Sequence, residues 1–199
     1  MRSVEKALPV RALAQLRAAT AALHGQLDAT LPLAQPGATL PDYALHLRVL
    51  RQWLRHVQPA LSSVAPAVAA ATREPDPPRL RWIEDDLLAC PAALRGDATD
   101  RLPLRAAPAD AASCWGLAYV VEGSALGGQA LLRRLAPGLA PHPLRYLQGQ
   151  GAATGMRWRA FLAALEAALD GPEPVARASA AAAGAFEDLI RLYAHEVRP

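Results

Sequence analysis

Between residues 114 and 134, an apolar stretch with helical spacing carries four glycines. They are Gly116, Gly123, Gly127 and Gly128. Each interior glycine costs a helix on the order of 1 kcal/mol relative to alanine, so a bare backbone must be required here. The first three lie seven and four residues apart, which places them on one helix face, and the adjacent pair can kink the helix. Two explanations stay open: a second helix packs closely against this face, or a flat ligand lies on it.

The rest of the chain predicts one all-α domain over residues 1–199, with residues 1–9 flexible. Clusters of proline and glycine separate segments of helical length. These clusters fall at residues 32–41, 75–78, 103–108, 137–143 and 171–174. No run of β-branched residues with a period of two occurs, and the chain is rich in alanine and leucine, which favours helix.

Two segments show a continuous apolar stripe with helical spacing. The segment that starts near Asp42 repeats apolar residues at Tyr43, Leu47, Leu50, Leu54, Val57 and Leu61. The last segment, residues 175–196, places Ala182, Phe186, Leu189 and Tyr193 on one face. Such stripes are typical of helices that face a core. We expect His46 to lie off the first stripe, on a face rich in arginine.

Composition excludes several classes of function. Of the two cysteines, Cys90 and Cys114, neither belongs to a metal-binding pair. The 21 basic residues give a net charge of only +3 and are scattered, so we expect no nucleic-acid partner. No apolar run approaches the roughly 20 residues that span a bilayer, and the start of the chain does not resemble a secretory signal. We expect a cytoplasmic protein without a membrane partner.

A histidine on the first predicted helix, residues 10–29, stands at the edge of an apolar stripe. The stripe consists of Leu16, Thr20, Leu23 and Leu27, and the histidine is His24. Arg17 shares its face about 10 Å away along the axis, and Asp28, four residues later, can reach the second ring nitrogen. Such a carboxylate orients a metal-ligating imidazole. The set suits an anionic macrocycle with a central metal, although a purely structural or surface histidine is the common alternative.

The two segments together resemble the haem oxygenase family in its bacterial, biliverdin-producing form. The first motif is Leu16-Arg17-x-x-Thr20-x-x-Leu23-His24, and the second is Glu122-Gly123-Ser124-x-Leu126-Gly127-Gly128. Their order and their separation of about a hundred residues also match the family. The resemblance implies a helical fold in which haem lies between a proximal helix and a kinked, glycine-rich distal helix.

The resemblance also implies roles for individual residues. His24 would ligate the iron, and Arg17 would pair with a haem propionate. Ser124, Gly123 and Gly127 would form the catalytic distal side. The residues expected to contact haem are Arg17, Thr20, Asp28, Tyr119, Gly123, Gly127, Gly128, Arg157, Arg159 and Phe186. A role in the core is equally open for Phe186.

In activity, the family resemblance implies cleavage of haem with dioxygen to biliverdin, carbon monoxide and ferrous iron. Electrons would come from a ferredoxin or a flavoprotein reductase, since the chain has no flavin or nicotinamide motif. A bacterial phytochrome is a possible acceptor of the bilin. One departure matters: animal-type enzymes carry an aspartate where this chain has Ser124, and a serine is no comparable acid. A haem carrier or sensor without oxygenase activity, and a helical interaction protein without haem, remain alternatives.

Overall fold

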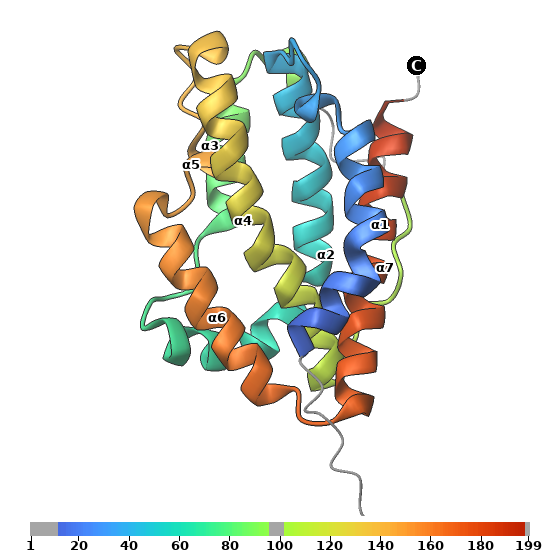
Figure 1. Ribbon diagram of the computed structural model, residues 1–199. Helices are drawn as coiled ribbons and strands as arrows, with labels where there is room; N and C mark the ends of the chain where they lie inside the picture. Colours follow the sequence, from blue (N-terminus) through green and yellow to red (C-terminus); the bar gives the residue numbers. More distant parts are fainter. Residues whose placement is uncertain (1–11, 96–101, 198–199) are drawn as a thin grey trace, which may run out of the picture.

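The computed structural model describes residues 12–95 and 102–197, and within these ranges all regular structure is helical (Figure 1). The helices are α1 (Ala12–Thr30), α2 (Leu40–Thr72), α3 (Arg79–Ala89), α4 (Ala111–Leu139), α5 (Arg145–Gln148), α6 (Thr154–Ala168) and α7 (Pro172–Glu196). Short 3-10 helices occupy Pro32–Ala34, Ala92–Leu94 and Gly151–Ala153. The all-α prediction is therefore confirmed. The segment 1–9, expected to be flexible, lies outside the described residues.

Helix α7 connects the two helices that carry the predicted motifs. It packs extensively on both α1 and α4, while α2 contacts α3, α4, α6 and α7. Figure 1 shows α1 and α7 together on one side of the molecule, with α2 and α4 between them and the smaller helices. Both motif helices are thus fixed to the same neighbour.

Helix starts coincide with residues that satisfy free backbone N–H groups. In the first turn of α2, Asp42 Oδ2 accepts hydrogen bonds from the backbone N–H of Thr39 at 2.7 Å and from its hydroxyl at 2.6 Å. Before α4, Asp110 Oδ1 accepts from the Ser113 N–H at 3.1 Å. Such caps stabilise a helix start by about 1 kcal/mol. The glycine-rich helix therefore has a defined beginning.

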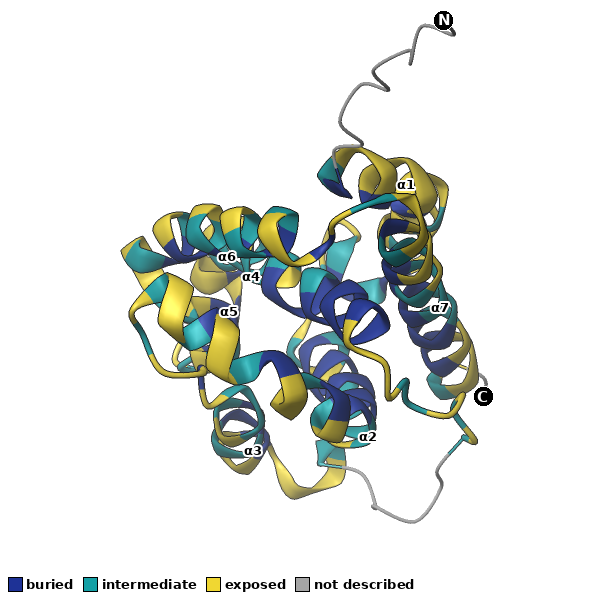
Figure 2. Cartoon of the chain, turned by 90° about the horizontal axis from the view of Figure 1, so that it is seen from below, coloured by how far each residue is buried: buried dark blue, intermediate teal, exposed yellow. Residues whose placement is uncertain are grey.

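The predicted core stripes are largely confirmed. All four stripe residues of α7 are buried, and on α2 only Leu61 is left partly exposed. Figure 2 shows buried residues along the inner sides of α2 and α7, and many exposed residues on α1. The prediction for His46 was wrong, because this side chain is only 8% exposed. Helix α2 is covered by neighbours on several sides, so its buried surface is wider than one stripe.

Within the described ranges, no helix combines the length and the apolar character needed to cross a membrane.

Candidate functional site

His24 lies on the exposed side of α1 with one ring nitrogen already bound. Its Nδ1 is 2.9 Å from Asp28 Oδ2, and both side chains are 61% exposed. The ring lies beside Phe186 of α7, with 5.5 Å between ring centroids. Among the described residues, Nε2 has no hydrogen-bond partner. The contact expected between Asp28 and His24 is thus present, and it leaves Nε2 free for a ligand.

Other residues of α1 divide between the exposed face and the core. Arg17 is exposed, and a Cβ added at Gly25 would meet no atom within 4 Å. Thr20 is buried, and its hydroxyl donates to the Leu16 carbonyl at 2.8 Å. The expected contact of Thr20 with a cofactor stays a prediction, and it would have to be made without the hydroxyl proton, which is bound to the helix backbone.

Helix α4 runs unbroken through all four glycines, which lie in different surroundings. At Gly116 a Cβ would collide with the backbone of Ala178 on α7. At Gly127 it would meet nothing within 4 Å, and at Gly123 its nearest neighbour would be the Trp158 ring at 3.4 Å. Close helix packing therefore explains Gly116, and it does not explain Gly127. The expected smooth groove does not reach Gly116, because α7 covers that end of the face.

The second glycine of the adjacent pair has a different neighbour. A Cβ at Gly128 would lie 3.6 Å from the carbonyl oxygen of Leu147, which belongs to α5. This is ordinary van der Waals contact. Gly128 thus faces α5, while Gly127 next to it faces open space.

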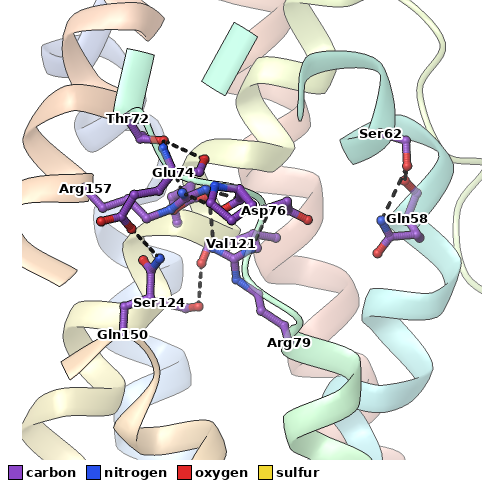
Figure 3. A network of polar contacts seen from close by, with 12 residues as sticks. Gln58, Ser62, Thr72, Glu74, Asp76, Arg79, Val121, Ser124, Gln150 and Arg157 are labelled. Atoms are coloured by element: carbon purple, nitrogen blue, oxygen red, sulfur yellow. Dashed lines mark hydrogen bonds and ion pairs between the residues drawn. The ribbon is translucent and has the colours of Figure 1, made fainter. Parts of the chain in front are cut away.

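Two polar residues of the glycine segment are only partly enclosed. Ser124 is exposed, and its hydroxyl donates to the Val121 carbonyl at 2.8 Å (Figure 3). Tyr119 is partly buried, with its ring centroid 5.7 Å from that of Trp158. Ser124 Oγ therefore offers lone pairs to a neighbour, while its proton is held by the backbone.

Arg157 is a residue whose predicted role the structure corrects. It is only 4% exposed and binds Glu122 through two bonds, Nε to Oε2 at 2.9 Å and Nη2 to Oε1 at 2.8 Å. Its Nη1 donates to Thr72 Oγ1 and to the Pro75 carbonyl, each at 3.2 Å. A guanidinium that is bound at all three nitrogens inside the protein does not supply a contact to a propionate. Arg159, two residues later, is exposed on α6.

Glu122 is the partner of Arg157 that sequence reasoning missed. It also accepts from Arg79, whose Nη2 lies 2.9 Å from Oε1, so two arginines share one carboxylate. Burial by itself would raise the pKa of Glu122, but the hydrogen bonds and charges of Arg157 and Arg79 hold it below its usual range. A glutamate inside an apolar helix needs a cation as partner, and that requirement was a usable signal in the sequence.

Phe186 has the core position that the sequence left open, and its expected contact with haem stays a prediction. It is 8% exposed and part of the core, and its ring also contacts His24. Its position limits how the imidazole can turn.

Fold and site together define an all-α protein that presents an oriented histidine on one helix and a bare glycine surface on another. The family model described as "Heme oxygenase" matches residues 10–195, and the chain therefore belongs to the haem oxygenase family. A relative named "Heme oxygenase" from Xanthomonas campestris pv. campestris (strain 8004) is 40% identical over 91 residues. This alignment covers 44% of the chain, and it spans about half of that relative, 54% of its length.

The fold has a match among solved structures. The chain is similar to the NO- and CO-bound haem oxygenase from Neisseria meningitidis, with a TM-score of 0.71 and 21% sequence identity. The similarity covers 94% of this chain and 92% of the other. At this identity, the match establishes the fold alone.

Proposed function

We propose that this protein cleaves haem, with dioxygen and electrons supplied from outside, to biliverdin, carbon monoxide and ferrous iron. Membership of the haem oxygenase family makes haem the expected substrate. The observation that carries the proposal is the geometry of His24: Asp28 binds Nδ1 at 2.9 Å, and Nε2 is left without a partner among the described residues.

The residues present fit a planar iron porphyrin. Haem iron is commonly held by a histidine, and a metal-ligating histidine usually donates its other ring N–H to a carboxylate, a backbone carbonyl or water. Gly25 on α1 and Gly127 on α4 both face open space, where a Cβ would reduce the room for a flat ring. Helix α7, which packs on both of these helices, contributes the Phe186 ring beside His24.

Bound haem would supply the iron that activates dioxygen and would itself be the ring that is opened. The protein contributes binding, orientation and control of water and protons. His24 Nε2 would hold the iron, and Asp28 would fix the ring tautomer by accepting the proton at Nδ1. Arg17 and Arg159, both exposed, are the cations proposed for the propionates. Gly123 and Gly127 would leave room for the porphyrin ring beside the backbone of α4.

Electrons must come from a separate protein in this proposal, and a ferredoxin or a flavoprotein reductase is the expected class of donor. A bacterial phytochrome is a possible recipient of the bilin. Both remain proposals that rest on the family.

Titration of the purified protein with haemin tests the proposal. We expect a stoichiometric Soret shift that His24→Ala abolishes. Ascorbate or ferredoxin with its reductase should then convert the bound haem to biliverdin. Stoichiometric binding without biliverdin would contradict the oxygenase and leave a carrier or sensor. A Soret shift that is unchanged in His24→Ala would contradict the site itself.

A further inference from the structure

Helix α5 covers the side of α4 next to the open glycine surface. A Cβ at Gly128 would contact the Leu147 carbonyl oxygen of α5, whereas a Cβ at Gly127 would meet nothing within 4 Å. Successive residues of a helix point about 100° apart, so α5 lies directly beside the surface left open at Gly127. Figure 1 shows α5 against α3 and α4, and Leu147 is buried between them. This short helix therefore forms one border of the proposed haem site.

Helix α5 cannot hold this place by itself. It consists of Arg145–Gln148 alone, and isolated helices shorter than about 12 residues are marginal in water. Leu144, the residue before it, has a φ of 53°, a conformation that residues with a Cβ rarely adopt. The position of α5 must therefore come from contacts with neighbouring helices.

One of these contacts comes from a buried carboxylate of α3. Asp86 is 0% exposed, and its Oδ2 accepts the backbone N–H of Tyr146 at 2.9 Å. The same oxygen accepts the Tyr43 hydroxyl proton at 2.6 Å. A buried carboxylate is costly unless donors of this kind surround it. The start of α5 is thus attached to α3.

The other contact comes from α4, at the residue that follows the glycine pair. The side-chain amide of Gln129 donates to the Leu147 carbonyl at 3.1 Å and to the Gln148 carbonyl at 2.5 Å. The last carbonyls of a helix have no partner within it, so Gln129 binds groups that α5 leaves free. Gly128 allows the close approach of the two helices, and Gln129 supplies the hydrogen bonds between them.

We propose that Gln129 is a positioning residue for haem. By holding α5 against Gly128, it fixes the border of the open surface at Gly127 and closes that side of the site around the bound ring. Gln129 acts through α5 and not through a contact with haem. The inference rests on the proposed function, because it concerns how the site retains haem.

The test uses two substitutions that differ in hydrogen-bond donors. Methionine and lysine have nearly the helix propensity of glutamine, so α4 itself should be little affected by Gln129→Met or Gln129→Lys. Methionine has no donor, whereas the lysine ammonium can still donate to the carbonyls of α5. Gln52→Met is the matched control: Gln52 of α2 is also partly buried and donates to the Leu102 carbonyl at 2.9 Å.

Hydrogen exchange of the haem-free protein measures whether Gln129 holds α5. Amides of residues 145–149 should exchange about tenfold faster in Gln129→Met, which loses two neutral hydrogen bonds. Their exchange should stay within about twofold of wild type in Gln129→Lys and in Gln52→Met. Unchanged exchange in Gln129→Met would overturn the proposal, because α5 would then be held without Gln129.

Transfer of haem from the haemin complex to an excess of apomyoglobin measures retention. Haem should leave Gln129→Met about tenfold faster, while its association rate changes less than about twofold, since such changes act mainly on dissociation. Release from Gln129→Lys and Gln52→Met should stay within about twofold of wild type. Unchanged release from Gln129→Met, or an equal acceleration in Gln52→Met, would contradict a role for α5 in holding haem.

The two measurements separate this inference from the proposed function. If the wild-type protein binds no haem, the proposed function is rejected, even where hydrogen exchange shows that Gln129 holds α5. If haem binds and exchange in α5 is the same in wild type and Gln129→Met, the inference is rejected and the proposed function stands.

Discussion

Arg157 and Glu122 form a two-bond ion pair inside the protein, with nitrogen–oxygen distances of 2.8 and 2.9 Å. The pair joins α6 to α4 one residue before Gly123. Because Arg79 of α3 binds the same carboxylate, three helices are fixed to each other at the start of the glycine segment. The position of the glycine segment of α4 therefore depends on this buried network of charged side chains.

Substitution Glu122→Gln should lower the free energy of unfolding by about 3 to 5 kcal/mol, since it leaves two arginines without their shared counter-charge. Urea denaturation of the haem-free protein measures the loss. Glu84→Gln is the control, because Glu84 also pairs with two arginines, Arg55 at 2.6 Å and Arg51 at 3.6 Å, but its own side chain is 36% exposed. Such surface pairs contribute about 1 kcal/mol or less. Equal losses in the two variants would contradict a structural role for Glu122.

Asp28→Asn should weaken haem binding about 10- to 100-fold, which is the usual effect of removing a carboxylate that orients a metal-ligating histidine. Asn keeps the size of the side chain but lowers its power to accept the His24 proton. Stability without haem should hardly change, because the contact is largely exposed. Haemin titration and thermal unfolding measure the two quantities. Unaltered affinity in Asp28→Asn would show that the carboxylate does not support the iron ligand.

The fold was predictable because its signals are local. Stripes such as Ala182 to Tyr193 and the breaks at proline and glycine depend only on neighbours in sequence. Both are present in the structure, except that α4 continues through Pro137 to Leu139 before it ends. The contact of His24 with Asp28 was predictable for the same reason, since residues four apart meet on a helix.

Other features of the site depend on which helices pack together. Gly116 and Gly127 share a helix face, and only the path of α7 shows that one is covered and the other open. The sequence predicts that Arg157 contacts a propionate. The structure instead pairs it with Glu122 of α4, which lies 35 residues away in the sequence. The contact between His46 and Tyr193 spans 147 residues, and no local pattern indicates it.

Burial of neutral His46 should make the protein lose stability in weak acid. The pKa of His46 falls from 6.5 to about 4 in the folded state, so below pH 6.5 the unfolded chain binds a proton that the folded chain does not. The stabilisation is complete above pH 6.5 and is lost as the pH falls to about 4, a total of roughly 3 kcal/mol. Urea denaturation at a series of pH values between 4 and 7 measures this slope.

His46→Asn should flatten that slope, because asparagine can still accept the Tyr193 hydroxyl but does not titrate. His195→Asn is the control, since His195 is exposed near the end of α7. This control should keep the wild-type slope. If His46→Asn kept it as well, the acid sensitivity would arise elsewhere.

Gly127→Ala should stabilise the haem-free protein by about 1 kcal/mol and weaken haem binding at least tenfold. The gain follows from helix propensity, since the added Cβ meets no atom within 4 Å. The weaker haem binding follows if the haem ring lies on the backbone at Gly127, where the added methyl group would take up its space. Gly138→Ala is the matched control on α4: its Cβ also meets nothing, so it should stabilise similarly and leave haem affinity unchanged.

Gly116→Ala should instead destabilise by about 1 to 3 kcal/mol, because its Cβ collides with the Ala178 backbone. Thermal unfolding and haemin titration of the three variants separate a glycine kept for packing from one kept for a ligand, and equal haem affinities in Gly127→Ala and Gly138→Ala would show that the open glycine surface does not bind haem.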